Sequence, residues 1–236
     1  MGWKLGVFVL GLALFFPINI FADAPTVIPV GLDRSFVPVG FDDNDRTEIH
    51  VAGVFPDTCY KVGPTRFDVD KTNKIIAIEQ SAYHYSGVCI RVIVPYSQKI
   101  ELGILESGNY QLKDATSGKM LGSLPVGLAK TESADDFLYA PVSDAQIRNH
   151  DGKNYLYLRG SFTDRCMTLK EVVIHYYQEV IVVQPIAKYE GTADNCGYQM
   201  IRYHQEVPLK EGITGDWLVH VRSMDGKAVD RFAQFP

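Results

Sequence analysis

The sequence predicts an all-β protein made of two tandem antiparallel β-sandwich domains, each with one internal disulfide. Three observations lead to this prediction. The four cysteines form two pairs with the same spacing of 30 residues, Cys59 with Cys89 and Cys166 with Cys196. The chain matches itself at one fixed offset, and short alternating apolar segments are separated by turn residues about every ten positions.

The self-match is wider than the cysteines. Shifting the chain by 107 positions superimposes both cysteine pairs without a gap, and it also superimposes other identical residues: Gly53 and Gly160, Phe55 and Phe162, Asp57 and Asp164, Leu102 and Leu209, Gly108 and Gly215. Self-similarity at a fixed offset is typical of repeated architecture. We therefore expect one unit used twice, with repeat 1 over residues 25–121, a polar linker over 122–138 and repeat 2 over 139–236.

The first 22 residues are typical of a signal peptide. Lys4 supplies a positive charge, Leu5–Phe16 is an apolar run, and Ala22 offers a small residue before the cleaved bond. A membrane anchor is the alternative, but Pro17 and Asn19 interrupt a run already short of the roughly 20 residues that span a bilayer. We expect export to the periplasm or the extracellular space, with no integral membrane segment after cleavage.

Export favours oxidised cysteines, and an even number of cysteines fits a disulfide framework. Four cysteines allow three pairings, of which only Cys59–Cys89 with Cys166–Cys196 keeps each bridge inside one repeat. Zinc is a weak alternative, because no two cysteines have the close spacing of a zinc site.

The strand predictions rest on period-2 alternation and on continuous apolar runs. The alternating segments are Glu48–Val54, Cys89–Val94, Asn109–Asp114 and Tyr155–Gly160; the buried ones are Lys74–Ile78 and Val180–Val183. Asp225-Gly226, between two valine-containing segments, predicts a hairpin tip. No stretch shows a sustained helical period.

The run Ile100–Leu112 and its copy Val207–Val219 resemble the L-x-x-G-x-Y corner of immunoglobulin-like and fibronectin type III-like sandwiches in exported bacterial proteins. The resemblance implies two tandem Ig-like domains, with Gly108 and Tyr110, and Gly215 and Trp217, as structural corners. Trp217 departs from the pattern, because an indole can fill the space but cannot bond in the same way. The resemblance implies an architecture and no activity.

The chain shows no catalytic motif. It has no G-x-S-x-G elbow, paired carboxylates for glycoside cleavage cannot be identified, and its six histidines do not match between the repeats. We expect no enzyme, no cofactor and no metal, although Asp42-Asp43-Asn44-Asp45 with Asp135-Asp136 leaves calcium at the domain junction open. The net charge of −5 argues against a nucleic-acid partner.

Functional residues should lie where the two repeats differ. The ligand-binding candidates are the tyrosines and the histidine of two segments: Tyr83, His84 and Tyr85, and Tyr155 and Tyr157. Alternatively, some of these rings face the core. The sequence predicts an adhesion-type binding protein that recognises a protein or glycan through sandwich edges or end loops. The alternatives are a periplasmic assembly scaffold or chaperone-like partner and, less favoured, an enzyme with an unrecognised site.

Overall fold

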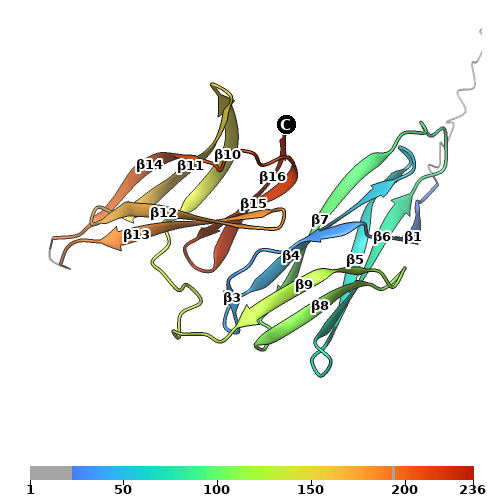
Figure 1. The fold of residues 1–236 in the computed structure, drawn as a ribbon, viewed down its shortest axis with the longest axis horizontal. Coiled ribbons are helices and arrows are strands. Elements are labelled where there is room, and N and C mark those ends of the chain that lie inside the picture. Colours follow the sequence, from blue (N-terminus) through green and yellow to red (C-terminus); the bar gives the residue numbers. More distant parts are fainter. Residues whose placement is uncertain (1–22, 193–194) are drawn as a thin grey trace, which may run out of the picture.

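The computed structural model describes residues 23–192 and 195–236, so the predicted signal peptide lies outside the described residues. The described chain is all-β and forms two sandwiches (Figure 1). The first contains nine strands: β1 Thr26–Val30, β2 Arg34–Phe36, β3 Phe41–Asp42, β4 Thr47–Phe55, β5 Tyr60–Asp70, β6 Ile75–His84, β7 Val94–Gly103, β8 Gly108–Asp114 and β9 Met120–Gly127. The second contains seven: β10 Val142–His150, β11 Lys153–Asp164, β12 Met167–Tyr177, β13 Val180–Tyr189, β14 Tyr198–Pro208, β15 Gly215–Ser223 and β16 Lys227–Phe235.

Each sandwich consists of a three-stranded sheet facing a larger one. In the first sandwich, β2-β4-β7 faces the sheet β1-β6-β8-β9-β3, in which β5 pairs with the other side of β6. In the second, β10-β11-β14 faces β12-β13-β15-β16. The predicted two-sandwich fold is confirmed, and most strand pairs are antiparallel. Parallel pairing of β6 with β8 and of β13 with β15 adds a feature that alternation alone does not predict.

The two sandwiches share one pattern of pairing and one register. Ile49 pairs with Ile100 between β4 and β7, and Leu156 pairs with Val207 between β11 and β14. In the parallel pairs, Ile76 lies beside Leu112, and Val183 lies beside Val219. Each residue of one pair is 107 positions from its counterpart, so the offset seen in the sequence is also the offset of the hydrogen-bond ladders.

Two separate cores fill the sandwiches, and alternate residues of each strand supply them. Completely buried members include Ile49, Ile76, Ile78, Leu112 and Leu124 in the first core. The second core contains Leu156, Leu158, Ile181, Val183 and Val219, also completely buried. Each core lies within its own sandwich, so each domain buries its apolar surface mainly by itself.

The same packing unit occurs in both domains: it contains Gly53, Phe55 and Tyr96 in the first and Gly160, Phe162 and Tyr203 in the second. The Tyr96 ring stacks on Phe55 at 4.3 Å, and the Tyr203 ring stacks on Phe162 at 4.9 Å. The two hydroxyls donate to the carbonyls of Gly31 and Pro141, each at 3.0 Å.

Burial raises the pKa of Tyr96 and of Tyr203 to about 12, with the carboxylates of Asp33 and Asp114 adding to the shift at Tyr96. Both hydroxyls therefore remain protonated donors at any physiological pH. Each hydroxyl ties a strand of the three-stranded sheet to the segment that opens its domain.

Tyr110 and Trp217 both bond to the backbone that precedes them. Tyr110 is completely buried, and its hydroxyl donates to the carbonyl of Glu106 at 3.0 Å. Trp217 also bonds back to the chain, because its Nε1 donates to the carbonyl of Thr214 at 2.9 Å. The indole nitrogen reaches the carbonyl three residues back, whereas the tyrosine hydroxyl reaches the one four residues back, so the two corners bond differently.

Both predicted disulfides are present, Cys59–Cys89 and Cys166–Cys196, with Cα–Cα distances of 5.4 and 5.5 Å. In both domains an aspartate two residues before the first cysteine accepts a bond from that cysteine's backbone N–H, at 2.8 Å for Asp57 and 2.7 Å for Asp164. The matched aspartates therefore shape the turn that carries the bridge.

Two sequence predictions differ from the structure. The segment predicted as a strand, Cys89–Val94, is irregular as far as Ile93, because Cys89 is held by its disulfide outside the ladder that starts at Val94. The predicted linker over residues 122–138 begins inside β9, where Leu124 and Val126 are buried in the first core. Gly122 and Pro125 give this strand the composition of a loop, although its pairing with β8 continues to Val126 and Gly127 pairs with β3.

Within residues 23–192 and 195–236, no helix is long and apolar enough to cross a membrane.

The matched glycines offer a test of the packing unit. A Cβ on Gly160 would lie 1.9 Å from the backbone oxygen of Pro141 and 2.6 Å from the Tyr203 ring. We expect Gly160→Ala to lower the free energy of unfolding by about 3 kcal/mol, measured by urea denaturation. Gly197→Ala is the matched control, because a Cβ there meets no atom within 4 Å. Equal stability of the two variants would contradict the packing described.

Candidate functional site

The outer face of the three-stranded sheet is used differently in the two domains. In the first domain this face, carried by β2, β4 and β7, is partly covered by the second domain, and Val54 on β4 stays 50% exposed (Figure 1). Phe36 packs there with Val180, Val182 and Leu218, and its ring meets that of Phe232 edge-on at 5.1 Å. The second sandwich thus docks on the first through the outer face of β13, β15 and β16.

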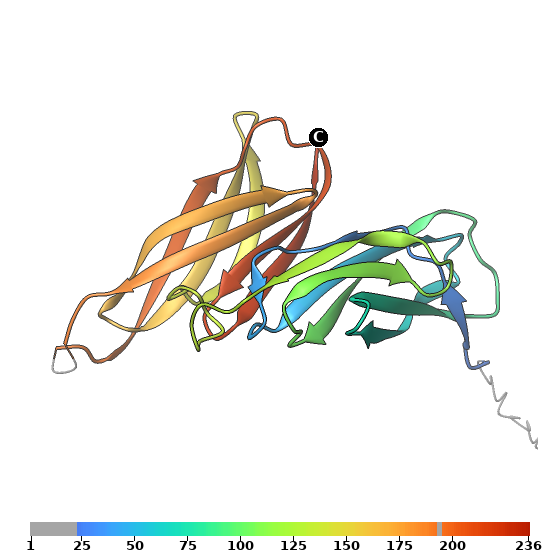
Figure 2. The same ribbon diagram turned by 60° about the horizontal axis from the view of Figure 1, so that its bottom comes forward.

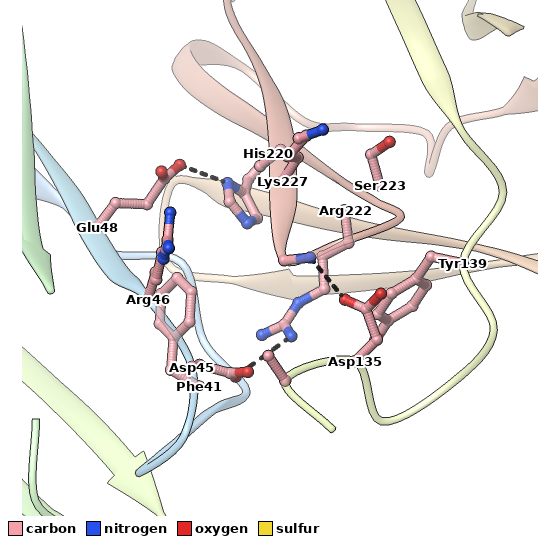
Figure 3. Close-up of a pocket in the computed structure, with 13 residues that line it drawn as sticks. Phe41, Asp45, Arg46, Glu48, Asp135, Tyr139, His220, Arg222, Ser223 and Lys227 are labelled. Carbon is pink, nitrogen blue, oxygen red and sulfur yellow. Dashed lines mark hydrogen bonds and ion pairs between the residues drawn. The ribbon is translucent and has the colours of Figure 1, made fainter. Parts of the chain in front are cut away.

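Charged side chains surround this apolar contact. Lys99 Nζ lies 2.5 Å from Glu48 Oε2 and 3.1 Å from Asp230 Oδ2. His220 Nδ1 lies 2.8 Å from Asp230 Oδ1 and 3.4 Å from Glu48 Oε1, and Figure 3 shows Glu48 and His220 facing each other across the domain boundary. We call Glu48, His50, Lys99, His220 and Asp230 the interdomain cluster.

The cluster is deeply buried, and its carboxylates control its protonation. His220 is only 1% exposed. Burial alone would lower the pKa of His220, but hydrogen bonds and attraction from Asp230 and Glu48 outweigh burial and raise that pKa above its usual value. Burial disfavours the charged form of Asp230, yet the His220 and His50 imidazoles hold the pKa of this carboxyl well below its usual range. With His220 protonated, two carboxylates face two cations.

Arg222 closes the other side of the boundary. Its guanidinium donates to the carbonyl of Gly40, lies 3.6 Å from Asp45 Oδ2 and covers the Phe41 ring at 5.1 Å (Figure 3). A cavity of about 20 Å³ lies beside it, enough for a single water molecule. This space is too small for an organic ligand.

The acidic residues that left calcium open are largely engaged in holding the backbone. Asp45 Oδ2 accepts from the backbone N–H of Asp42, and the Asp135 carboxylate accepts from those of Asp225 and Gly226, all at 2.9 Å. Burial, followed by repulsion from the Asp136 carboxylate, raises the pKa of Asp42. The Asp135 carboxylate therefore connects the linker to the hairpin of the second domain, whereas Asp45 stabilises a turn within the first domain.

Three groups among the described residues bring possible metal ligands within 4.8 Å of one another. Two of them consist of an aspartate and a bonded cystine, whose sulfurs are already used. The third is Glu48, His220 and Asp230, where the Lys99 amine already bridges the two carboxylates. The Lys99 amine thus already balances part of the negative charge of these two carboxylates.

The equivalent face of the second domain, on β10, β11 and β14, carries a different set of residues. At the 107-residue offset, Tyr155 and Tyr157 replace Glu48 and His50, and Glu206 replaces Lys99. The His150 ring stacks on Tyr155 with 4.0 Å between centroids, and the Arg148 guanidinium lies over Tyr157 at 3.8 Å. We call this face the aromatic face. Leu156 and Leu158 point into the core, so both tyrosines point outward.

Ion pairs hold the charged side chains of this face in place. Asp144 is bound by Arg159 and by Arg231, and these hydrogen bonds lower the pKa of its carboxyl to about 2. His150 Nε2 lies 2.8 Å from Glu206 Oε1. The Tyr157 ring also lies near that of His204, with 6.0 Å between centroids. The aromatic face therefore presents rings and guanidinium groups that are already ordered.

The structure separates the two groups of ligand-binding candidates. Tyr83 and His84 are half-buried near the end of β6, between β1 and β5, and the His84 ring leans on Tyr60 at 4.7 Å. Tyr85 is exposed, with Lys61 Nζ 5.3 Å from its ring centre. Tyr155 and Tyr157 lie in the other domain, on the aromatic face.

Sequence reasoning did not select Arg148, His150 or His204 as functional candidates. Arg148 and His150 lie on β10, opposite Tyr155 and Lys153 of β11, so only the hairpin register brings them beside the tyrosines. The 107-residue offset could have pointed to this face. It aligns the outward residues of β11 and β14 with the residues of β4 and β7 that contact the second domain.

The fold and its two disulfides define a two-domain β-sandwich protein. Within it, residues 49–114, which run from β4 to β8 of the first sandwich, match a family model described as the ORF11 beta-sandwich domain. The match agrees with the sandwich observed for this part of the chain. No curated protein and no solved structure matches the chain.

The interdomain cluster predicts a pH dependence of stability. The folded-state pKa of His220 is raised, so its contribution is complete below the unfolded value of about 6.5 and is lost as the pH rises through the folded-state value. Asp230 titrates far below this window. We expect the free energy of unfolding, measured with urea between pH 6 and 9, to fall with rising pH.

His220→Gln should be less stable at pH 6 and should lose this slope. His175→Gln is the control, because His175 is exposed on β12 and should follow the unmodified protein. An unchanged slope in His220→Gln would refute the assignment.

Proposed function

We propose that the chain is an exported, non-enzymatic binding protein that recognises a folded protein partner through the aromatic face of its second domain. The two disulfides support an oxidising compartment outside the cytosol. The corner bonds of Tyr110 and Trp217 support an immunoglobulin-like assignment of both sandwiches.

The observation that carries the proposal concerns the outer face of the three-stranded sheet. This face contacts another domain in the first sandwich and points to solvent in the second. In the first domain the outer face of β4 and β7 binds a folded partner, namely the second domain. In the second domain the residues at the same positions point to solvent, and they are tyrosine, arginine and histidine. Sheet faces of this geometry therefore accommodate another protein surface, and a second face of the same shape is available.

The chemistry of the aromatic face also fits a protein partner. Tyrosine and arginine are enriched among the residues that dominate protein–protein binding. Here Tyr155 and Tyr157 are already stacked on His150 and Arg148, so little side-chain entropy remains to be lost on binding. Arg148 and Arg202 on this face favour a partner surface with acidic groups, whereas Arg159 is already paired with Asp144.

An assembly scaffold is the second candidate. Strand β14 pairs with β11 on one side only, and Tyr198 and Met200 are exposed on it. A partner strand could add to this edge by backbone hydrogen bonds. Such a partner would contact β14 along its length and would depend little on Tyr157.

The experiment is capture of partners from envelope and secreted extracts by residues 23–236, followed by affinity measurement with the purified partner. Tyr157→Ala combined with Arg148→Ala should weaken binding by about 2 kcal/mol or more, roughly 30-fold. Tyr177→Ala is the matched control, since Tyr177 is an exposed tyrosine of the opposite sheet.

Binding that resists Tyr157→Ala but is lost when proline is placed in β14 would favour the scaffold. Binding to a glycan array that depends on Tyr155 and Tyr157 would instead identify a saccharide ligand.

A further inference from the structure

A second surface, at the far end of the first domain, has no role in the proposal above. The segment Tyr85–Ile93 joins β6 to β7, and we call it the apolar loop. It exposes four aliphatic side chains to solvent: Val88 is 101% exposed, Ile90 68%, Val92 50% and Ile93 68%. The first core is complete without them. Contiguous exposed aliphatic groups are unfavourable in water and commonly mark a contact site.

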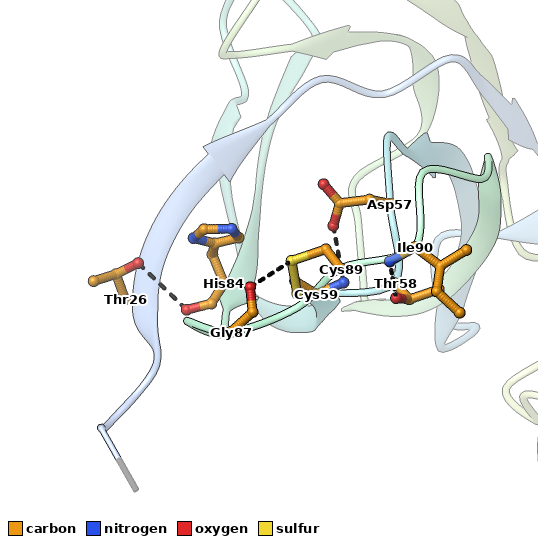
Figure 4. The surroundings of a disulfide bond; sticks show 8 residues. All are labelled: Thr26, Asp57, Thr58, Cys59, His84, Gly87, Cys89 and Ile90. Atoms are coloured by element: carbon orange, nitrogen blue, oxygen red, sulfur yellow. Dashed lines mark hydrogen bonds between the residues drawn. A yellow bond between two sulfur atoms is a disulfide. The ribbon is translucent and has the colours of Figure 1, made fainter.

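The loop is held in shape, so its apolar groups cannot turn inward. Cys89 is bonded to Cys59 at the start of β5 (Figure 4). The backbone of Ile90 makes two hydrogen bonds with Thr58: its N–H donates to the hydroxyl at 3.0 Å, and its carbonyl accepts from the N–H at 3.2 Å. The N–H of Tyr85 donates to the carbonyl of Cys59 at 2.9 Å. The disulfide turn thus presents Val88 and Ile90 outward.

The charge around the loop is positive, although the chain carries −5 overall. Arg91 is the one charged residue of the segment, and it is exposed. The Lys61 amine lies over the Tyr85 ring at 5.3 Å. The nearby carboxylate of Asp57, which accepts a hydrogen bond from the backbone N–H of Cys59 at 2.8 Å, keeps its negative charge, so the two cations outnumber it by one. Aliphatic groups flanked by a lysine and an arginine match a surface that combines hydrocarbon with anionic groups.

The position of the loop also points to a bilayer. Thr26 pairs with His84, the last residue of β6, so the chain enters the first domain beside the apolar loop. The preceding 22 residues include the apolar run Leu5–Phe16. A bilayer that takes up this run during export, before cleavage, would be adjacent to the loop. At the 107-residue offset, Val88, Ile90 and Val92 correspond to Asn195, Gly197 and Gln199 in the second domain, and only Ile93 corresponds to an apolar residue, Met200.

We propose that the apolar loop docks the first domain on the surface of an anionic lipid bilayer. Val88, Ile90, Val92 and Ile93 enter the boundary between headgroups and acyl chains. Arg91 and Lys61 stay at the level of the lipid phosphates, where long cationic side chains are most stable. The aromatic face lies at the opposite end of the molecule and remains free (Figure 2).

The test is co-sedimentation of residues 23–236 with vesicles. This form contains both complete cores and lacks the apolar run, which would itself bind lipid. Vesicles of phosphatidylethanolamine with one-quarter phosphatidylglycerol should bind the protein, and phosphatidylcholine vesicles should bind it more weakly. Val88→Ser combined with Ile90→Ser should reduce the partition coefficient by about tenfold or more.

The matched control is Met120→Ser combined with Leu128→Ser, which removes two exposed apolar side chains elsewhere, 52% and 71% exposed. This control should bind vesicles like the unmodified protein. Arg91→Glu should lower binding to anionic vesicles and leave the weak binding to phosphatidylcholine unchanged. As an independent readout, tryptophan placed by Ile90→Trp should shift its fluorescence to shorter wavelength when vesicles are added.

Failure of the unmodified protein to sediment with anionic vesicles would overturn the proposal. So would equal binding by the loop variant and the control. If the loop substitutions instead abolish self-association or capture of a protein, the loop is a protein contact and the membrane assignment is wrong. None of these outcomes depends on the aromatic face, so the two proposals fail or stand separately.

Discussion

The arrangement of the two domains depends on the neutralisation of two buried carboxylates. Glu48 belongs to the first domain and Asp230 to the second, while the cations that face them, Lys99 and His220, also come one from each. A buried carboxylate without a cation is strongly destabilising. Each carboxylate has its nearest cation in its own domain and a second cation across the boundary, so rotation or sliding would remove one of the two contacts that each carboxylate makes. The apolar contact around Phe36 adds affinity, but the charges fix the orientation.

One sheet geometry has acquired two roles in this chain. The cores, the corners, the glycine–tyrosine packing and the disulfides recur at the same offset, so they are what the sandwich requires. The outward positions of β4 and β11 do not recur: a glutamate and a histidine in one domain correspond to two tyrosines in the other. The difference is confined to side chains that do not affect folding of the sandwich, which is where a binding surface can change freely.

Most of the fold could be predicted from the sequence, because the offset, the cysteine spacing and the alternation all report on local pattern. β9 was missed because Gly122 and Pro125 resemble loop chemistry, whereas burial of Leu124 and Val126 depends on tertiary contacts. The segment Cys89–Val94 alternates like a strand, but its disulfide keeps it out of the ladder. Tyr155 and Tyr157 could be named in advance, but Arg148 and His150 could not, since only the β10–β11 register places them nearby.

The segment between the domains changes how strong their contact must be. Asn44 Nδ2 donates to the carbonyls of Thr131 and Ser133, and the Asp135 carboxylate binds the hairpin of β15 and β16, so this segment is attached at both ends. A short connection of this kind raises the effective concentration of one domain beside the other to the millimolar range. An intrinsic affinity of the same order, about 4 kcal/mol, is then enough to balance the open and closed forms. An interface too weak to hold two separate molecules can therefore keep this one closed.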